Sequence, residues 1–375
     1  MPGTWQGGET PGIPAIADIP HSRPALGKLE SAAVAAVMAS GHIAQGPEVE
    51  KLEAAMVRAL GIGADADSAS SHAVALSSGT AALYVALRAI GVGAGDEVLI
   101  PAYACASLNQ AVRHAGAQPR YVDCDPVSLN PDPEDARRKL SKRTAACIVP
   151  HLFGLPADVD AFGALGPPII EDCAQTLGVR LGDRLVGSFG DVVVCSFYAT
   201  KLVAGGEGGM MLSRDKSLIE RARALRDCED PQGDAESFNF KMSDLHAAIA
   251  GVQLKRLDEF LQRRADIATA YRAALDGATI DVPTLPDDRG HAWFRFVIML
   301  REHNVNALLR RCERHRLACR RPVGRLVAGV DIDQLPGCRT AWERACSVPL
   351  YPALTDDEAC QAPRRFAAAL DQDDD

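Results

Sequence analysis

One lysine lies at the centre of a stretch suited to carbonyl chemistry. Residues 191–212 read DVVVCSFYATKLVAGGEGGMML: an apolar run, a turn with Lys201, a glycine-dense reversal and a second apolar strand. Ligands of open α/β sheets bind at the carboxyl edge of the strands, where this turn would place the amine. Phe197 and Leu202 would partly desolvate it, which lowers its pKa and favours a Schiff base with a carbonyl. An exposed loop lysine is the alternative.

Polar residues also follow a second short apolar strand, PIIE, at 168–171. Glu171, Asp172 and Gln175 stand at its carboxyl end. An acidic pair at this position either caps the element that follows or stabilises a positive charge on a bound ligand.

A third motif is a small-residue turn between a strand and a helix. The strand expected over 72–76 runs into Ser77, Ser78, Gly79 and Thr80, and a helix follows. The turn would present backbone N–H groups and hydroxyls at a helix N-terminus, which is a phosphate-binding arrangement. The alternative is an ordinary N-cap by Ser78 or Thr80.

Short apolar strands alternate with helices around these motifs, which indicates a mostly parallel, helix-covered sheet. A single long helix is expected from Ser243 to about Leu275, and a strand over 293–300. We expect four parts: a mobile N-terminal extension (1–20), a large domain that carries these motifs (21–260), a small C-terminal domain (261–370) and an acidic tail (371–375).

Composition narrows the class of partner. The 375 residues carry a net charge of −9, and the pI of about 5.5 argues against nucleic acid or an anionic membrane as the partner. The eleven cysteines form no zinc-spaced cluster, so we predict reduced thiols and no metal site. No leader or membrane-length apolar run is evident, and we predict a cytoplasmic protein.

With these motifs in hand, the chain resembles the DegT/StrS family of fold type I, pyridoxal-phosphate-dependent aminotransferases that make amino sugars. The likeness extends in order from about Ile19 to Glu358. The matching segments are ALSSGTAALYVAL, GDEVLIPAY, PHLFGLPADVDAF, IIEDCAQTLG, VGSFGDVVVCSFYATK, GGEGGMML, MSDLHAAIAGVQLKRLDEFLQRR and VPLYPALTDDE. The resemblance implies an α/β, aspartate-aminotransferase-like fold, with a large αβα domain around a mostly parallel mixed sheet and a smaller α+β domain.

The resemblance also implies roles for individual residues. Lys201 would form the internal aldimine with pyridoxal 5'-phosphate and then carry the proton between the substrate carbon and the cofactor. Asp172 would hold the pyridine nitrogen protonated. Gln175 would approach the phenolic oxygen of the cofactor.

The same resemblance assigns the cofactor's phosphate to two subunits. Backbone N–H groups of Gly79 and Thr80, with the Ser196 hydroxyl, would bind it. Asn239 would reach the phosphate of a neighbouring subunit, which implies a homodimer with shared active sites.

One departure from the family pattern concerns the ring face of the cofactor. Cys105 stands where many members have a stacking aromatic residue. Tyr103, a residue from elsewhere, or the thiol with small side chains would cover that face, and the three alternatives stay open. His151 either faces the cofactor or substrate or is a hydrogen-bonded core histidine.

The leading functional prediction is transfer of an amino group from an amino acid, glutamate, to a keto group of a nucleotide-linked sugar. The alternative acceptor is a keto-cyclitol or another small ketone in natural-product biosynthesis. A sugar dehydratase of the same fold would have histidine in place of Lys201, and a cofactor-binding regulator would need a further module. Arg320 and Arg321 either meet an acidic group of the substrate or belong to a solvated face.

Overall fold

The structure is a computed structural model that describes residues 19–62, 72–229, 237–282, 286–301, 305–327 and 330–372. The predicted N-terminal extension and acidic tail fall largely outside these ranges. Within them the chain forms a seven-stranded sheet and a three-stranded sheet, with a two-stranded ribbon of β6 (Arg180–Leu181) and β7 (Arg184–Leu185).

The large sheet is mixed but mostly parallel. Its strands, in spatial order, are β1 (Ala73–Leu76), β9 (Gly209–Leu212), β8 (Val192–Ser196), β5 (Ile169–Asp172), β4 (Thr144–Pro150), β2 (Glu97–Pro101) and β3 (Gln118–Val122). Only β9 runs antiparallel to its neighbours. The register pairs Asp172 with Pro150 on one side and with Val194 on the other. The carboxyl ends of β4, β5 and β8 therefore meet at one edge.

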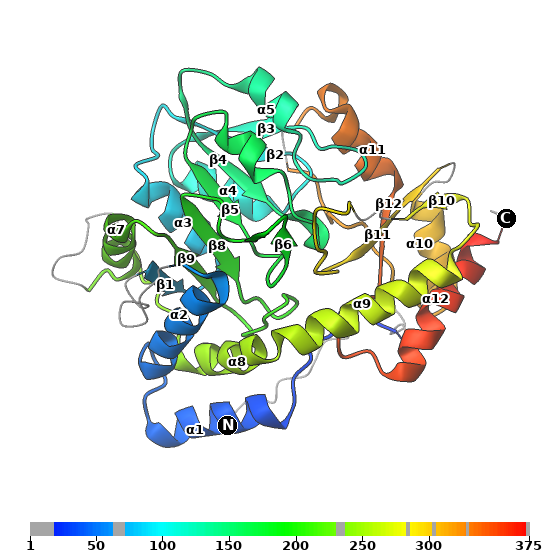
Figure 1. Ribbon diagram of the computed structural model, residues 1–375, viewed down its shortest axis with the longest axis horizontal. Helices are drawn as coiled ribbons and strands as arrows, with labels where there is room; N and C mark the ends of the chain where they lie inside the picture. The colour runs from blue at the N-terminus through cyan, green and yellow to red at the C-terminus, as the bar shows by residue number, and fades with distance from the viewer. Residues whose placement is uncertain are drawn as a thin grey trace, which may run out of the picture.

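Helices cover both faces of this sheet, as Figure 1 shows. One face packs against α3 (Gly79–Ala89), α4 (Ala106–His114) and α7 (Lys216–Arg226). The other packs against α2 (Pro47–Leu60), α8 (Asp244–Lys255), α5 (Pro133–Lys139) and α6 (Val159–Gly163). Val192 and Val194 face the first core and Val193 and Cys195 the second, which is why this strand is apolar throughout.

A smaller unit forms around the three-stranded antiparallel sheet β10 (Ile280–Asp281), β11 (Phe296–Leu300) and β12 (Ala345–Val348). Its helices are α9 (Leu257–Ala274), α10 (Val305–Arg314), α11 (Pro336–Arg344) and α12 (Asp356–Leu370). Helix α9 starts in a core of the large sheet with Leu257 and ends in the core of the small unit with Tyr271. We propose that the domain boundary lies within this helix, near residue 260.

The architecture confirms the predicted α/β class and corrects two predicted elements. The single helix over 243–275 is wrong, because Arg256 leaves the helical conformation (φ −102°, ψ 7°) and separates α8 from α9. The expected strand over 293–300 begins only at Phe296. Trp293 has a φ of +47°, and the segment before the strand bonds to the large unit instead.

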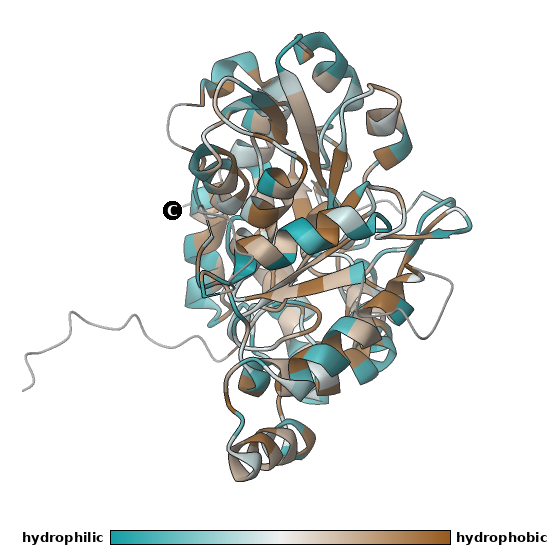
Figure 2. Ribbon diagram, turned by 90° about the vertical axis from the view of Figure 1, so that its left-hand side faces the viewer, coloured by the Kyte–Doolittle hydropathy of each residue, from teal (hydrophilic) through white to brown (hydrophobic). Residues whose placement is uncertain are grey.

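Helix α1 (Lys28–Ser40) stands away from the body of the molecule, and its ribbon is largely hydrophobic in colour (Figure 2). It packs against α8 through one face. None of the helices in the described part of the chain combines the length and the apolar character needed to cross a bilayer.

Candidate active site

A cavity of about 210 Å³ opens at the carboxyl ends of β4, β5 and β8. The predicted site residues that line it are Gly79, Thr80, Cys105, Asp172, Gln175, Ser196 and Lys201. The register of the large sheet explains the grouping, since Asp172 lies beside Val194 and Ser196 ends the same strand two residues later. Lys201 follows in the turn after β8.

Lys201 has mainly apolar surroundings. Phe197, Leu202 and Val203 are buried beside it in the core, and its Nζ lies 5.2 Å from the centre of the Phe294 ring. Burial lowers the pKa of Lys201, although the negative charge of Asp172 opposes that shift. The unprotonated amine is the form that attacks a carbonyl carbon, so this environment prepares Lys201 as a nucleophile.

Asp172 supplies the buried acidic group of the cavity, which is also lined by the exposed Glu207. Its Oδ1 accepts a hydrogen bond from the backbone N–H of Ala174 at 2.9 Å, and no hydrogen bond to Oδ2 is formed within the described part of the chain. Burial raises the pKa of Asp172, against the N–H of Ala174 and the charge of Lys201, which favour the ionised form. A half-satisfied carboxylate in a cavity is suited to bind a cationic N–H group.

The start of α3 forms a cradle for an anion. Ser78 caps this helix, and its Oγ accepts the N–H of Ala81 at 3.1 Å. Gly79 and Thr80 are the first helical residues and line the cavity, so their N–H groups have no acceptor inside the helix. A Cβ on Gly79 would lie 2.9 Å from Cβ of Ser196, so only glycine lets the turn approach this hydroxyl. The capping and phosphate-binding interpretations are thus compatible.

The side-chain amide of Gln175 is hydrogen-bonded through its oxygen. Its Oε1 accepts the backbone N–H of Phe153 at 2.8 Å. This bond orients the side chain and leaves the Nε2 donor for a group in the cavity, as an approach to an oxyanion requires. The donor set of the cavity thus comprises an amine, a carboxylate, an amide N–H and a helix N-terminus, and it fits pyridoxal 5'-phosphate.

The structure excludes Tyr103 from the three alternatives for the ring face of the cofactor. Tyr103 is fully buried, its hydroxyl donates to the carbonyl of Ala341 at 3.4 Å, and it does not line the cavity. The prediction that Tyr103 covers the cofactor ring is therefore wrong. Cys105 does line the cavity, together with the small side chains of Ala104 and Ser107.

His151 is a core histidine and does not contact the cavity. It is fully buried, its Nδ1 accepts the N–H of Ala157 at 2.9 Å, and its Nε2 pairs with Glu171 Oε1 at 3.0 Å. Glu171 also accepts backbone N–H groups of the loop at 187–190. Because both ring nitrogens are engaged, the substrate-facing alternative for His151 is wrong.

Three further predicted residues lie outside the cavity wall. Arg320 is exposed and exchanges backbone hydrogen bonds with Ser347. The Arg321 guanidinium packs 4.4 Å from the centre of the Trp342 ring. Asn239 is exposed, and its role toward a neighbouring subunit stays a prediction.

Sequence reasoning missed a second set of residues around Lys201. Phe294 and Arg295 precede β11 and join Lys201 in lining a narrow recess of about 20 Å³. The backbone of this segment is fixed to the large unit, since Ala292 N–H donates to Gly154 O at 2.8 Å and Arg295 N–H to Phe153 O at 3.1 Å. A Cβ on Gly154 would lie 2.7 Å from the Phe294 nitrogen, so glycine permits this approach. The sequence feature that could have indicated this set is Arg295, a charged residue within the otherwise apolar sequence WFRF.

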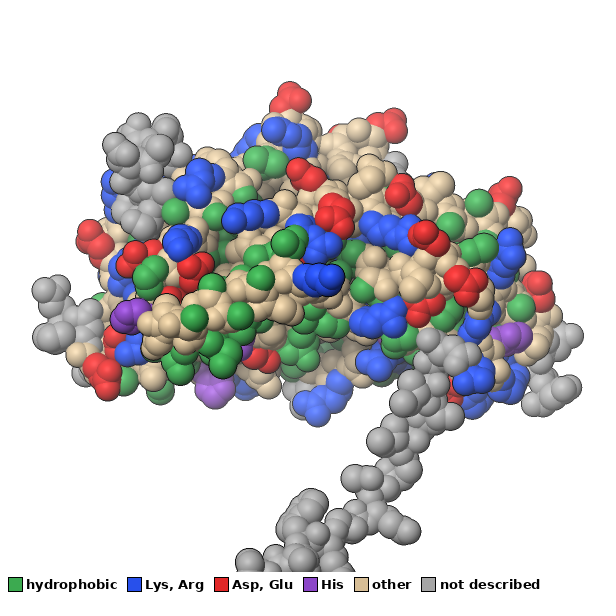
Figure 3. Space-filling view, turned by 90° about the horizontal axis from the view of Figure 1, so that it is seen from below, with side chains coloured by type: hydrophobic (Ala, Val, Ile, Leu, Met, Phe, Trp, Pro, Cys, Tyr) green, Lys and Arg blue, Asp and Glu red, His purple; other side chains and the backbone are tan. Residues whose placement is uncertain are grey.

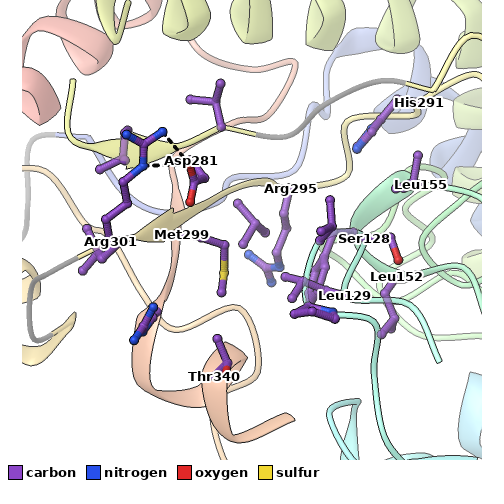
Figure 4. A pocket seen from close by; sticks show the side chains of 18 residues that line it. Ser128, Leu129, Leu152, Leu155, Asp281, His291, Arg295, Met299, Arg301 and Thr340 are labelled. Atoms are coloured by element: carbon purple, nitrogen blue, oxygen red, sulfur yellow. Dashed lines mark hydrogen bonds and ion pairs between the residues drawn. The ribbon is translucent and has the colours of Figure 1, made fainter. Parts of the chain in front are cut away.

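A groove of about 510 Å³ lies beside the recess, between the two units. Figure 4 shows the Arg295 side chain extending into this groove near Leu129 and Met299, while Asp281 and Arg301 pair with each other at its edge. Arg295 thus borders both the groove and the recess at Lys201.

Comparisons with known proteins agree with this geometry. The chain is 32% identical to the spore coat polysaccharide biosynthesis protein SpsC of Bacillus subtilis (strain 168), over 91% of this chain and 94% of that protein. The aminotransferase TlmJ from Streptoalloteichus hindustanus is 31% identical, with a TM-score of 0.86 over 94% of this chain and 98% of that chain. The sugar aminotransferase CalS13 from Micromonospora echinospora is 29% identical, with a TM-score of 0.82 over 93% and 99%.

These likenesses confirm the aspartate-aminotransferase-like fold and the predicted enzyme class, a pyridoxal-phosphate-dependent aminotransferase. The model of one aminotransferase family matches residues 24–362, which is most of the chain. The chain belongs to the DegT/DnrJ/EryC1/StrS aminotransferase family.

Proposed function

We propose that this aminotransferase moves an amino group from an amino acid, glutamate, to a keto group of a nucleotide-linked sugar in two successive half-reactions. The observation that carries the proposal is that Lys201, whose pKa is lowered by burial, and the Asp172 carboxylate line one cavity. The amine suits covalent chemistry at a carbonyl, and the carboxylate suits a bound cation.

Different residues around the cavity would bind different parts of pyridoxal 5'-phosphate. That cofactor, when bound, supplies an aldehyde and an electron-accepting ring. Gly79, Thr80 and Ser196 would bind its phosphate, and Asp172 would hold a proton at the ring nitrogen. Lys201 would accept a proton at Nζ from the substrate carbon and return it.

The relatives of this chain support a sugar as the acceptor. SpsC is a polysaccharide biosynthesis protein and CalS13 a sugar aminotransferase. A keto-cyclitol or another small ketone is the second candidate, because the cavity residues that would hold the cofactor serve either acceptor. The loops at 40–47, 228–238 and 320–326 are the proposed determinants of the choice, and part of the second lies outside the described residues.

A homodimer with shared active sites is part of the proposal. Several large apolar side chains are exposed, namely Leu26 (54%), Leu29 (62%), Met38 (66%), Ile43 (53%) and Phe238 (50%). Hydrophobic side chains gather along the lower face of the molecule in Figure 3, and exposed apolar patches favour burial against a partner. Asn239 follows the exposed Phe238, and burial of Phe238 against a partner would bring Asn239 toward the second subunit.

The test of the shared site uses two inactive parents. Lys201→Ala and Asn239→Ala subunits are mixed, unfolded and refolded together, and assayed for amino transfer. A heterodimer with shared sites keeps one intact site, so activity should exceed that of either parent. A mixture no more active than its parents would contradict the sharing.

The function itself is tested with purified protein and added cofactor. Amino donors are screened against keto sugars and keto-cyclitols, and each half-reaction is followed by the absorbance of the bound cofactor. We expect glutamate to change the spectrum and a nucleotide-linked keto sugar to restore it. If only a keto-cyclitol restores the cofactor spectrum, the second candidate acceptor is established. A protein that does not bind the added cofactor would refute both candidates.

A further inference from the structure

Beside Lys201, on the side away from Asp172, the recess gathers arginine side chains and, among the described residues, is lined by no acidic one. Arg264, Arg295 and Lys201 line the recess, and Arg320 is close enough to shift the pKa of Arg295. No aspartate or glutamate of the described ranges forms an ion pair with Arg295. A partly buried cation without a counter-ion is costly unless an anionic ligand completes the site.

The Arg295 side chain has donors to spare. Its Nη1 lies 3.0 Å from Nδ1 of His21, and His21 Nε2 lies 3.0 Å from the Ser347 hydroxyl. Burial, Arg295 and Arg320 lower the pKa of His21 to about 2, so this ring is neutral and does not balance the charge. Burial and Arg320 lower the pKa of Arg295 to about 10, so its guanidinium stays charged at neutral pH.

The backbone places this guanidinium at a fixed position relative to Lys201. Lys201 Nζ and Arg295 Cζ each lie 5.2 Å from the centre of the same Phe294 ring, so they are separated by at most twice that distance. The N–H of Arg295 donates to Phe153, whose own N–H donates to Gln175 in the cofactor cavity. Nη1 of Arg264 donates to the carbonyls of Trp293 and Phe294 and so holds the backbone on either side of that ring.

We propose that Arg295 binds the α-carboxylate of the amino donor while the donor's amino group is held at Lys201. The inference rests on the proposed function and names a donor subsite within it. A carboxylate accepts two parallel hydrogen bonds from a guanidinium, and Arg295 has its Nε and Nη2 groups for this purpose.

Size and distance favour a carboxylate over the diphosphate of a nucleotide-linked sugar. The recess measures about 20 Å³, room for one group of a few atoms. The α-carboxylate is attached to the carbon that carries the reacting nitrogen, so it stays near Lys201. A diphosphate is separated from the keto carbon by part of the sugar ring and would not reach the same recess.

The experiment compares two donors that differ only in this charge. L-Glutamate and L-glutamate α-amide are each mixed with the wild-type holoenzyme, and the half-reaction is followed by the absorbance of the bound cofactor. We expect kcat/KM for glutamate to exceed that for the amide about 10- to 100-fold. Equal kcat/KM values for the two donors with the wild-type enzyme would already overturn the proposal.

Variants then assign the discrimination to one side chain. Arg295→Gln should lower kcat/KM for glutamate about 10- to 100-fold and change the value for the α-amide less than about twofold. Arg295→Lys keeps the positive charge but loses the paired N–H donors of the guanidinium. Its kcat/KM for glutamate should therefore lie between the values for the wild type and for Arg295→Gln. Arg344→Gln is the matched control, because Arg344 lines the groove but not the recess. Equal losses with both donors, or a loss only with the keto-sugar acceptor, would overturn the proposal.

A binding measurement gives a readout besides activity. Glutarate, which has carboxylates and no amine, is titrated calorimetrically into each folded holoenzyme. Arg295→Gln should weaken its binding at least about tenfold and Arg344→Gln should not. Unchanged glutarate binding would overturn the inference alone, whereas failure of every amine to change the cofactor spectrum would overturn the proposed function.

Discussion

The two sides of Lys201 carry opposite charge. On the cofactor side, the Asp172 carboxylate raises the pKa of Lys201, and on the side of the recess the Arg295 guanidinium lowers it. An acidic wall is suited to a cationic ring nitrogen and a basic wall to a carboxylate. The difference shows how one amine can stand between a cofactor and a donor that need opposite partners.

The two sides are also built differently. The acidic side comes from adjacent strand ends of one sheet, so a single register brings Asp172, Ser196 and Lys201 together. The basic side combines His21, Arg295 and Arg320, which are far apart in the sequence and are brought together only by tertiary packing.

The largest expected effect is at the residue between the two sides. Lys201→Ala should abolish the half-reaction with any donor, because no other amine of the cavity can replace Nζ. The protein should still fold, as shown by an unchanged far-UV circular dichroism spectrum. Borohydride treatment should label wild-type Lys201 with the cofactor and leave the variant unlabelled. Substantial turnover by the variant would remove Lys201 from its role.

Asp172→Asn tests the acidic side. A neutral amide cannot hold the positive charge at the ring nitrogen, so we expect the half-reaction to slow about 100- to 1000-fold with either glutamate or its α-amide. Equal loss with both donors distinguishes this side from Arg295, where the loss depends on the donor. Rates near those of the wild type would refute the assignment.

Gly79→Ala tests the anion cradle on the same side. The added Cβ would meet Ser196 at 2.9 Å and push the first turn of α3 away from that hydroxyl. We expect the cofactor to bind about tenfold more weakly, measured by fluorescence titration of the cofactor-free protein. Gly251→Ala is the control, since Gly251 is helical and has open space around it, and it should bind the cofactor normally.

The smallest effects are shifts in pH dependence, and they have opposite signs on the two sides. Removing the charge of Asp172 takes away an influence that raises the pKa of Lys201, so Asp172→Asn should lower that pKa. Arg295→Gln removes an influence that lowers the same pKa, so it should raise it. The measurement is the rate at which trinitrobenzenesulfonate modifies Lys201 in cofactor-free protein, as a function of pH. Shifts in the same direction would contradict the comparison.

The sequence predicted the acidic side better than the basic side, for a physical reason. Asp172, Ser196, Lys201 and Gly79 follow strand ends or begin a helix, and local patterns indicate such positions. Tyr103 and His151 lie in the same kind of segment, but their side chains point into the core, a choice that depends on what packs behind the strand. The role of Arg295 was not predictable from local pattern, because its surroundings are assembled from distant segments.

The contact of Gly154 with the segment before β11 has a mechanical consequence. Two backbone hydrogen bonds tie residues 292–295 to the turn at 153–154 of the large unit, although β11 itself belongs to the small sheet. A rotation of the small unit would therefore bend the chain between Arg295 and Phe296 and leave Arg295 travelling with Lys201. Opening and closing of the small unit would then leave the distance between Lys201 and Arg295 unchanged, so the reacting amine and the proposed carboxylate-binding group would keep the same spacing in either position.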